Sequence, residues 1–176
     1  MGKKVKKYNE SGFEIEISKR HFRFSECDAY KQISGKSIKE MDFCIFDDKK
    51  NELTFLEIKN YEQIKNKSEL NTGKLIETLC LKVVDSLLMF CAVWLRTSWG
   101  SDFLSCVPTR IKNFIEIRKI NIFFFINLPK SIQTLNIIQD EVNRKLEGKL
   151  NIFGIDRANF FFEKQKIERL VGIKID

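Results

Sequence analysis

The feature that most restricts the fold is a pair of apolar segments, MDFCIFDD and ELTFLEIKN, joined by the charged turn DKKN. Each segment has the length of a strand, and a charged turn between two such segments predicts a β-hairpin. If Asp47 pairs with Glu52, the same register places Asp42 opposite Glu57. Directly opposed residues in an antiparallel pair have Cβ atoms about 5 Å apart. The sequence therefore predicts two carboxylates face to face on a largely apolar hairpin.

A lysine accompanies these two acids. Lys59 lies two residues after Glu57, and residues two apart in a strand share a face. Two carboxylates with apolar neighbours repel each other and cost stability unless a cation or protons compensate. Mg²⁺ suits one or two carboxylates together with a substrate phosphate, so we expect Asp42 and Glu57 to bind it. The alternative is a charged strand end at the sheet margin, held only by a salt bridge to Lys59.

The acid-x-Lys spacing is not specific by itself. It occurs three more times, as Asp47/Lys49, Asp48/Lys50 and Glu147/Lys149. Those pairs fall in a turn or at an expected helix end, where charges are solvated at little cost. Only the pair at 57 and 59 lies in an apolar strand that has an acid facing it across a hairpin.

The rest of the chain predicts alternating strands and helices. FEIEI, near the N-terminus, alternates like a half-buried strand, and INIFFFINL suits a central strand covered on both faces. FIEIR is a candidate strand start, and ANFFFE predicts another strand. The order of these elements indicates a single α/β or α+β domain over residues 1–176 with a mixed sheet.

Two helices are expected between these strands. Asn71 or Thr72 is expected to cap a long helix, whose second half, LLMFCAVWL, is apolar all round and should be buried. Ser131 is expected to cap a second helix that ends before Gly148. The apolar stripe of the first helix consists of Leu75, Leu79, Val83, Leu87 and Phe90. Its polar stripe consists of Lys74, Thr78, Lys82 and Asp85.

The hairpin resembles the PD-(D/E)xK nuclease superfamily, which includes restriction enzymes, resolvases and repair nucleases. The family pattern is an Asp at the start of one strand, then Glu or Asp, any residue and Lys on the next. Here it reads Asp42 and Glu57-Ile58-Lys59, with Met41 in place of the usual Pro. The resemblance covers residues 13–128 and is sharpest over 39–61. It implies a restriction-endonuclease-like three-layer sandwich, in which helices flank a central mixed β-sheet.

By this resemblance the protein would hydrolyse phosphodiester bonds of nucleic acid, DNA rather than RNA, as an endo- or exonuclease using Mg²⁺ or Mn²⁺. Asp42, Glu57 and the Ile58 backbone carbonyl would hold the metal, which lowers the pKa of a bound water and stabilises the pentavalent phosphorane charge. Lys59 would position that water or stabilise the same charge, and the product would carry a 5′-phosphate.

The family often adds an upstream acid from a first helix. No helix is predicted before residue 13, and Glu26 is the best candidate, ahead of Asp28.

The net charge of +7 suits a polyanion partner, and the alternative explanation is ordinary solubility, since many basic proteins bind no nucleic acid. Lys74 and Lys82 are candidate nucleic-acid contacts on the polar stripe of the long helix. Arg110 and Lys112 are further candidates, in a basic stretch near aromatic residues. The alternatives are a solvated helix face and scattered surface charge.

Fold-level analogy suggests defence against foreign DNA, or recombination and repair, with a homodimer or a larger defence complex as the assembly. Two alternatives remain open. One is a catalytically inactive nuclease fold that binds nucleic acid or a protein, and the other is a structural protein without a site. Divalent-metal binding, lost when Glu57 is replaced, separates the enzyme from the last of these.

Cysteine, histidine and hydropathy set further expectations. The five cysteines are odd in number and lack CxxC spacing, which favours reduced, buried, cytosolic thiols. The single histidine, His21, supports neither a zinc site nor a catalytic triad.

The basic N-terminal segment is not followed by an apolar one, so no signal peptide is expected. VVDSLLMFCAVWL is too short to span a bilayer and contains Asp85, so we expect a cytoplasmic protein without membrane contact.

Overall fold

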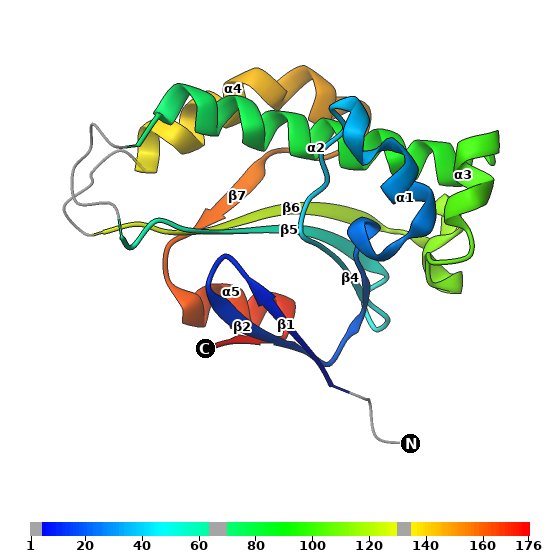
Figure 1. Cartoon of the computed structure of the whole chain (residues 1–176), viewed down its shortest axis with the longest axis horizontal. Helices are drawn as coiled ribbons and strands as arrows, with labels where there is room; N and C mark the ends of the chain where they lie inside the picture. Colours follow the sequence, from blue (N-terminus) through cyan, green and yellow to red (C-terminus); the bar gives the residue numbers. More distant parts are fainter. Residues whose placement is uncertain (1–4, 64–69, 130–134) are drawn as a thin grey trace.

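The computed structural model describes residues 5–63, 70–129 and 135–176 and shows a mixed α/β fold (Figure 1). These residues contain two sheets and five α-helices, so the predicted α/β class with a mixed sheet is confirmed. The elements are β1 (Lys6–Glu10), β2 (Phe13–Ile17), β3 (Arg20–Phe22), α1 (Asp28–Ile33), β4 (Phe43–Asp47), β5 (Glu52–Asn60), α2 (Thr72–Trp94), α3 (Ser98–Phe103), β6 (Lys119–Asn127), α4 (Leu135–Ile152), β7 (Ala158–Phe161), α5 (Lys164–Val171) and β8 (Ile173–Ile175).

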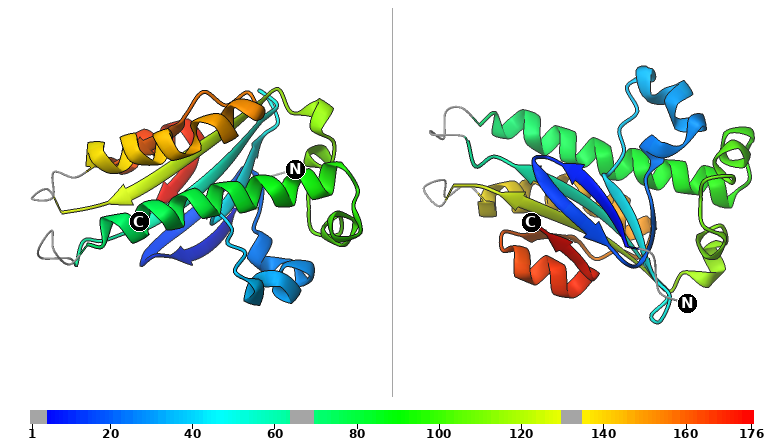
Figure 2. Two further views of the ribbon diagram at one scale, coloured as in Figure 1. Left: turned by 90° about the horizontal axis from the view of Figure 1, so that it is seen from above. Right: turned by 60° about the horizontal axis from the view of Figure 1, so that its bottom comes forward.

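A five-stranded sheet of order β3-β4-β5-β6-β7 forms the middle layer. β3, β4 and β5 are antiparallel neighbours, whereas β6 pairs with β5 and with β7 in parallel. α2 and α4 lie side by side on one face, and α5 with the small β1-β2-β8 sheet lies on the other (Figures 1 and 2). One outer layer therefore contains strands as well as a helix, where flanking helices alone were expected.

Alternation along β5 decides which side chains reach which layer. Leu53 and Phe55 belong to the core cluster under α2, whereas Leu56 and Ile58 belong to the cluster that includes α5. Successive strand residues point to opposite faces, so Glu57 falls on the α2 side. This parity positions the candidate site beneath the long helix.

The predicted hairpin register is confirmed. Asp47 pairs with Glu52, and the neighbouring pairs follow in the expected order up to Phe43 opposite Leu56. The turn is stabilised locally, because the Asp47 carboxylate accepts hydrogen bonds from the backbone N–H groups of two turn lysines. Asn51 closes the turn with a positive φ of 56°, a conformation that asparagine tolerates better than most residues. One residue beyond the last pair, the same register brings Asp42 opposite Glu57.

α2 begins as the sequence predicts. The Asn71 side chain accepts a hydrogen bond from the Lys74 backbone N–H at 2.9 Å and caps the helix. The prediction that its second half is buried all round is wrong in part, because Leu88 is 59% exposed. The helix packs on the sheet through one face only, and Leu88 points away from that face.

α4 extends further than the sequence predicts. The expected cap Ser131 lies outside the described residues, and Gly148 lies on an exposed face inside the helix rather than past its end. Buried Leu150 continues the apolar stripe of the helix four residues beyond Leu146. Burying that leucine outweighs the cost of about 1 kcal/mol of a glycine within a helix.

Two segments ahead of the central strands differ from the expectation. FIEIR does not start a strand: residues Phe114–Glu116 form a 3-10 turn, capped by the Asn113 side chain, and β6 begins at Lys119. The polar stretch after β3 contains α1, which the sequence did not predict. Its buried Tyr30 and Ile33 are spaced three apart, which is too short a pattern to reveal a helix of six residues.

The expectation that every cysteine is a reduced thiol is wrong. Cys27 and Cys106 form a disulfide across 79 positions of sequence, which joins the start of α1 to the loop after α3. Cys44, Cys80 and Cys91 are free, and Cys44 is buried as predicted. Spacing along the chain did not reveal the pair, because its members meet only when α1 and α3 pack at the same end of α2 (Figure 1).

Within the described residues, no helix combines the length and the apolar character that crossing a membrane requires.

Candidate active site

Four charged side chains from three elements meet under α2. Asp42 lies immediately before β4, Glu57 and Lys59 lie on β5, and Lys82 comes from α2. Glu57 is fully buried and Asp42 is 7% exposed, although both carry a carboxylate. The predicted meeting of Asp42 and Glu57 is therefore confirmed, and Lys59 lies beside them as expected.

Both carboxylates contact one ammonium group. The Nζ atom of Lys82 lies 2.6 Å from Glu57 Oε1 and 3.1 Å from Asp42 Oδ1. Lys59 Nζ lies 2.6 Å from the same Glu57 Oε1. Two carboxylates and two ammonium groups balance in formal charge, so the four side chains form a compact, neutral network.

Backbone hydrogen bonds fix the orientation of the two acids. Asp42 Oδ2 accepts a hydrogen bond from the Ile58 N–H at 2.8 Å, and Glu57 Oε2 accepts one from the Asp42 N–H at 3.3 Å. The Ile58 carbonyl, expected as a metal ligand, accepts a hydrogen bond from the Ser11 hydroxyl at 2.9 Å. A carbonyl oxygen has two lone pairs, so this contact leaves one available.

α2 also holds the segment that leads to Asp42. Asp85 accepts a hydrogen bond from the Lys39 N–H, and the buried Ser86 hydroxyl accepts one from the Met41 N–H, both at 2.9 Å. The sequence placed Asp85 only on a polar stripe, and it gave no sign of the role of Ser86. These contacts satisfy two backbone donors that the sheet does not pair, and they fix the approach of Asp42 to Glu57.

Burial controls the protonation of the network. Desolvation, with the neighbouring Asp42 charge second, raises the pKa of Glu57 from about 4.5 to about 7. Burial alone would lower the pKa of Lys82, but the charges of Glu57 and Asp42 and their hydrogen bonds outweigh it, so that pKa is raised. Lys82 therefore stays charged at neutral pH, whereas Glu57 gains or loses its proton close to neutral pH.

This titration predicts a pH-dependent stability in the metal-free protein. Because Glu57 is protonated in the folded state at pH values where the unfolded chain has lost that proton, its contribution to stability is fully present below about pH 4.5 and is lost as the pH rises through about 7. The loss attributable to Glu57 is on the order of 3 kcal/mol. Urea unfolding in EDTA from pH 5 to pH 8 measures it. Glu57→Gln is expected to flatten the profile and the exposed Glu62→Gln to leave it unchanged; identical profiles for all three proteins would contradict the assignment.

The third acid near the site is not the one expected. Glu26 is exposed at the end of the 3-10 turn Phe24–Glu26, and its charge acts on Tyr8 and His21. Glu40, two residues before Asp42, is instead half-buried and accepts a hydrogen bond from the Tyr30 hydroxyl. Burial raises the pKa of Glu40, and the charges of Lys82 and Asp42 act on it in opposite directions. Because Glu40 lies in a loop, no periodic pattern in the sequence indicated which way its side chain points.

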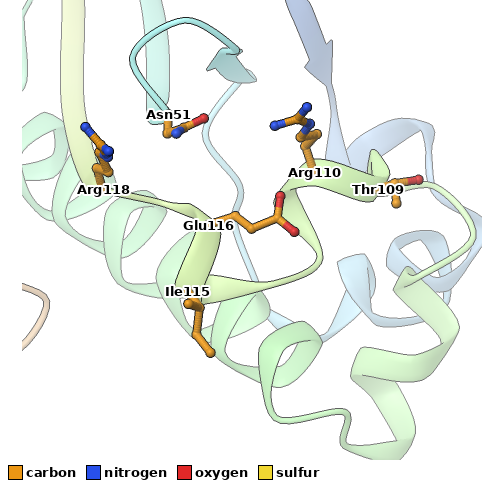
Figure 3. Close-up of a pocket in the computed structure, with 6 residues that line it drawn as sticks. All are labelled: Asn51, Thr109, Arg110, Ile115, Glu116 and Arg118. Carbon is orange, nitrogen blue, oxygen red and sulfur yellow. The ribbon is translucent and has the colours of Figure 1, made fainter.

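Arg110 and Lys112 lie away from this network. Arg110 lines a hollow of about 580 Å³ at the β4–β5 turn, together with Asn51, Glu116 and Arg118 (Figure 3). Glu57 is further along the extended strand that starts at this turn, about 20 Å away at 3.3 Å per residue. Lys112 follows Arg110 in the same loop. The role of these two basic residues as nucleic-acid contacts stays a prediction.

The structure thus brings together Asp42, Glu57, Lys59 and Lys82, and it places Lys74 two turns before Lys82 on the same helix. The sequence identified each of these five residues, but it did not predict that Lys82 contacts both acids. Comparison with protein-family models, with curated proteins and with solved structures finds no match for the chain.

Proposed function

We propose that this protein is a metal-dependent nuclease whose site consists of Asp42, Glu57 and Lys59. The observation that supports this function best is the convergence of two buried carboxylates on a single cation, the Lys82 ammonium, with Lys59 in contact with one of them. Buried acids are rare unless they are paired or hold a metal. The restriction-endonuclease-like fold implied by the hairpin is part of the same proposal.

The donor set fits a hard divalent cation. Asp42 and Glu57 offer carboxylate oxygens close enough to share one cation, and the Ile58 carbonyl keeps one lone pair. Mg²⁺ or Mn²⁺ bound there would lower the pKa of a coordinated water and neutralise charge on the phosphate. The residues supply the rest: the acids hold the ion, and the Lys59 ammonium orients the water or stabilises the oxyanion.

Lys82 decides when a metal can bind. Its ammonium lies between the two carboxylates, so it must withdraw before they can share an ion. The Lys82 side chain is 15% exposed and its stem is flexible, so it has a route toward solvent, where it can contact a phosphate instead.

The same contact favours a second candidate function. A lysine that neutralises both acids satisfies the charges without a metal, as expected for a nuclease-like fold that binds nucleic acid or a protein without cutting it. Metal binding distinguishes the two functions, because only the nuclease requires it.

The wider biology follows from the resemblance alone. DNA rather than RNA as substrate, a part in defence against foreign DNA or in recombination and repair, and a homodimer or defence complex all belong to the proposal at that level.

The test incubates the purified protein with linear duplex, circular and single-stranded DNA and with RNA, in Mg²⁺, Mn²⁺ or EDTA. Cleavage of at least one substrate in either metal, and none in EDTA, is expected. Calorimetry with Mg²⁺ in the absence of nucleic acid gives an independent measurement. Tight nucleic-acid binding with no heat of metal binding and no cleavage would favour the second candidate function.

A further inference from the structure

A small hollow adjoins the candidate active site, between β5 and the first two turns of α2. It has a volume of about 250 Å³, and its lining includes Lys59, Tyr61, Lys74, Leu75 and Thr78. Lys59 belongs to both places, since its ammonium lies 2.6 Å from Glu57. The hollow and the pair of acids therefore have Lys59 in common.

The geometry of a helix over a strand explains this lining. Four helix residues advance about 6 Å and two strand residues about 6.6 Å, so a stripe at every fourth helix position stays in step with every second strand position. α2 runs antiparallel to β5, with Lys82 over Glu57. The stripe then continues with Thr78 near Lys59 and Lys74 near Tyr61, as the lining of the hollow confirms.

The chemistry of the hollow matches one nucleotide. Tyr61 offers an aromatic surface, Leu75 an apolar wall, and Lys59 and Lys74 offer ammonium groups for phosphates. Bases stack on aromatic side chains whatever their identity, at about 1–3 kcal/mol per base. The volume is below the 300–1,000 Å³ or so of pockets that enclose drug-sized ligands, which leaves room for a single base.

We infer that the nucleotide next to the cleaved phosphate is unpaired and that its base enters this hollow and stacks on Tyr61. A base that is still paired carries its partner strand with it and does not fit. This inference deepens the proposed nuclease function, on which it rests, by naming the substrate class: single-stranded nucleic acid, frayed ends or a base displaced from a duplex.

The binding test uses a fluorescein-labelled single-stranded 12-mer oligodeoxynucleotide and its blunt duplex, measured by anisotropy in EDTA so that nothing is cut. The single strand is expected to bind at least about tenfold more tightly than the duplex. Tyr61→Ala is expected to weaken single-strand binding about five- to a hundredfold, and Tyr61→Phe to preserve it. Trp99→Ala removes another exposed aromatic residue, far along the chain from the hollow, and is expected to change nothing.

A second variant guards against simple misfolding. Thr78→Phe fills the hollow from the half-buried face of α2 without removing a core side chain, and it is expected to weaken single-strand binding as Tyr61→Ala does. Equal affinity for both oligonucleotides, unaltered by either change, would overturn the inference.

Failure of this inference and failure of the nuclease proposal give different results. Lys59-dependent cleavage of duplex and single strand at equal rates, indifferent to Tyr61, would remove the nucleotide site and keep the nuclease. Binding that depends on Tyr61 without cleavage in any metal would keep the site and remove the nuclease.

Discussion

Replacing Lys59 by alanine is expected to slow Mg²⁺-dependent cleavage by about 10²–10³-fold while changing the affinity for nucleic acid only a few-fold. Lys59 contacts Glu57 directly, so its ammonium is close enough to the acids to act on the reacting phosphate. Removing one group that stabilises developing negative charge costs a factor of this size in other enzymes. Because that charge appears only in the transition state, kcat falls and KM stays nearly constant. Single-turnover cleavage measures the effect.

The hairpin supplies a matched control. Asp48 and Lys50 repeat the same acid-x-Lys spacing on the same hairpin, but they lie in the turn, away from the site, where Asp48 forms an exposed ion pair with Arg20. Lys50→Ala is expected to retain full activity. Equal activity of Lys59→Ala and the wild-type protein would mean that the cleavage comes from a contaminant or from another site, and the nuclease proposal would then fail.

The sequence alone predicted the central part of the fold because short-range rules determine it. In a hairpin, one pair and the period of two determine all the others, so Asp47 opposite Glu52 was enough to bring Asp42 to Glu57. The cap of α2 at Asn71 was predictable for the same reason, since a capping side chain acts within three residues.

Features that depend on packing between distant elements were not predictable in this way. The Cys27–Cys106 disulfide requires α1 and α3 to pack together. Neither strand pairing nor hydrophobic periodicity in the sequence predicts that contact. Glu40 rather than Glu26 lies near the acids because a loop, and not a regular element, carries it there. The polar stripe of α2 contained Lys82, but only the rotation of the helix over β5 shows that its ammonium contacts both carboxylates.

Lys82→Met is expected to have the largest effect on stability. It keeps the side chain unbranched and only one atom shorter, and it removes the charge that lies between the two buried acids. Asp42 and Glu57 are then left to repel each other, with only the Lys59 ammonium still in contact with Glu57. Removing one partner from a buried ion pair costs about 3–5 kcal/mol. Urea unfolding at pH 8 in EDTA measures this loss. Lys74→Met, on the same helix but outside the network, is the matched control and is expected to change stability by less than about 0.5 kcal/mol.

Added Mg²⁺ turns the same variant into a test of the whole proposal. In the wild-type protein the ion must displace the Lys82 ammonium, whereas in Lys82→Met that competitor is gone. The variant is therefore expected to bind Mg²⁺ at least about tenfold more tightly, and to regain stability as RT ln(1 + [Mg²⁺]/Kd) with increasing ion concentration. Calorimetry and unfolding in graded Mg²⁺ measure both effects. If the variant stays unstable at millimolar Mg²⁺ and gives no heat of binding, the four charges are a structural ion network. Asp42 and Glu57 would then bind no metal even without the competing Lys82 ammonium.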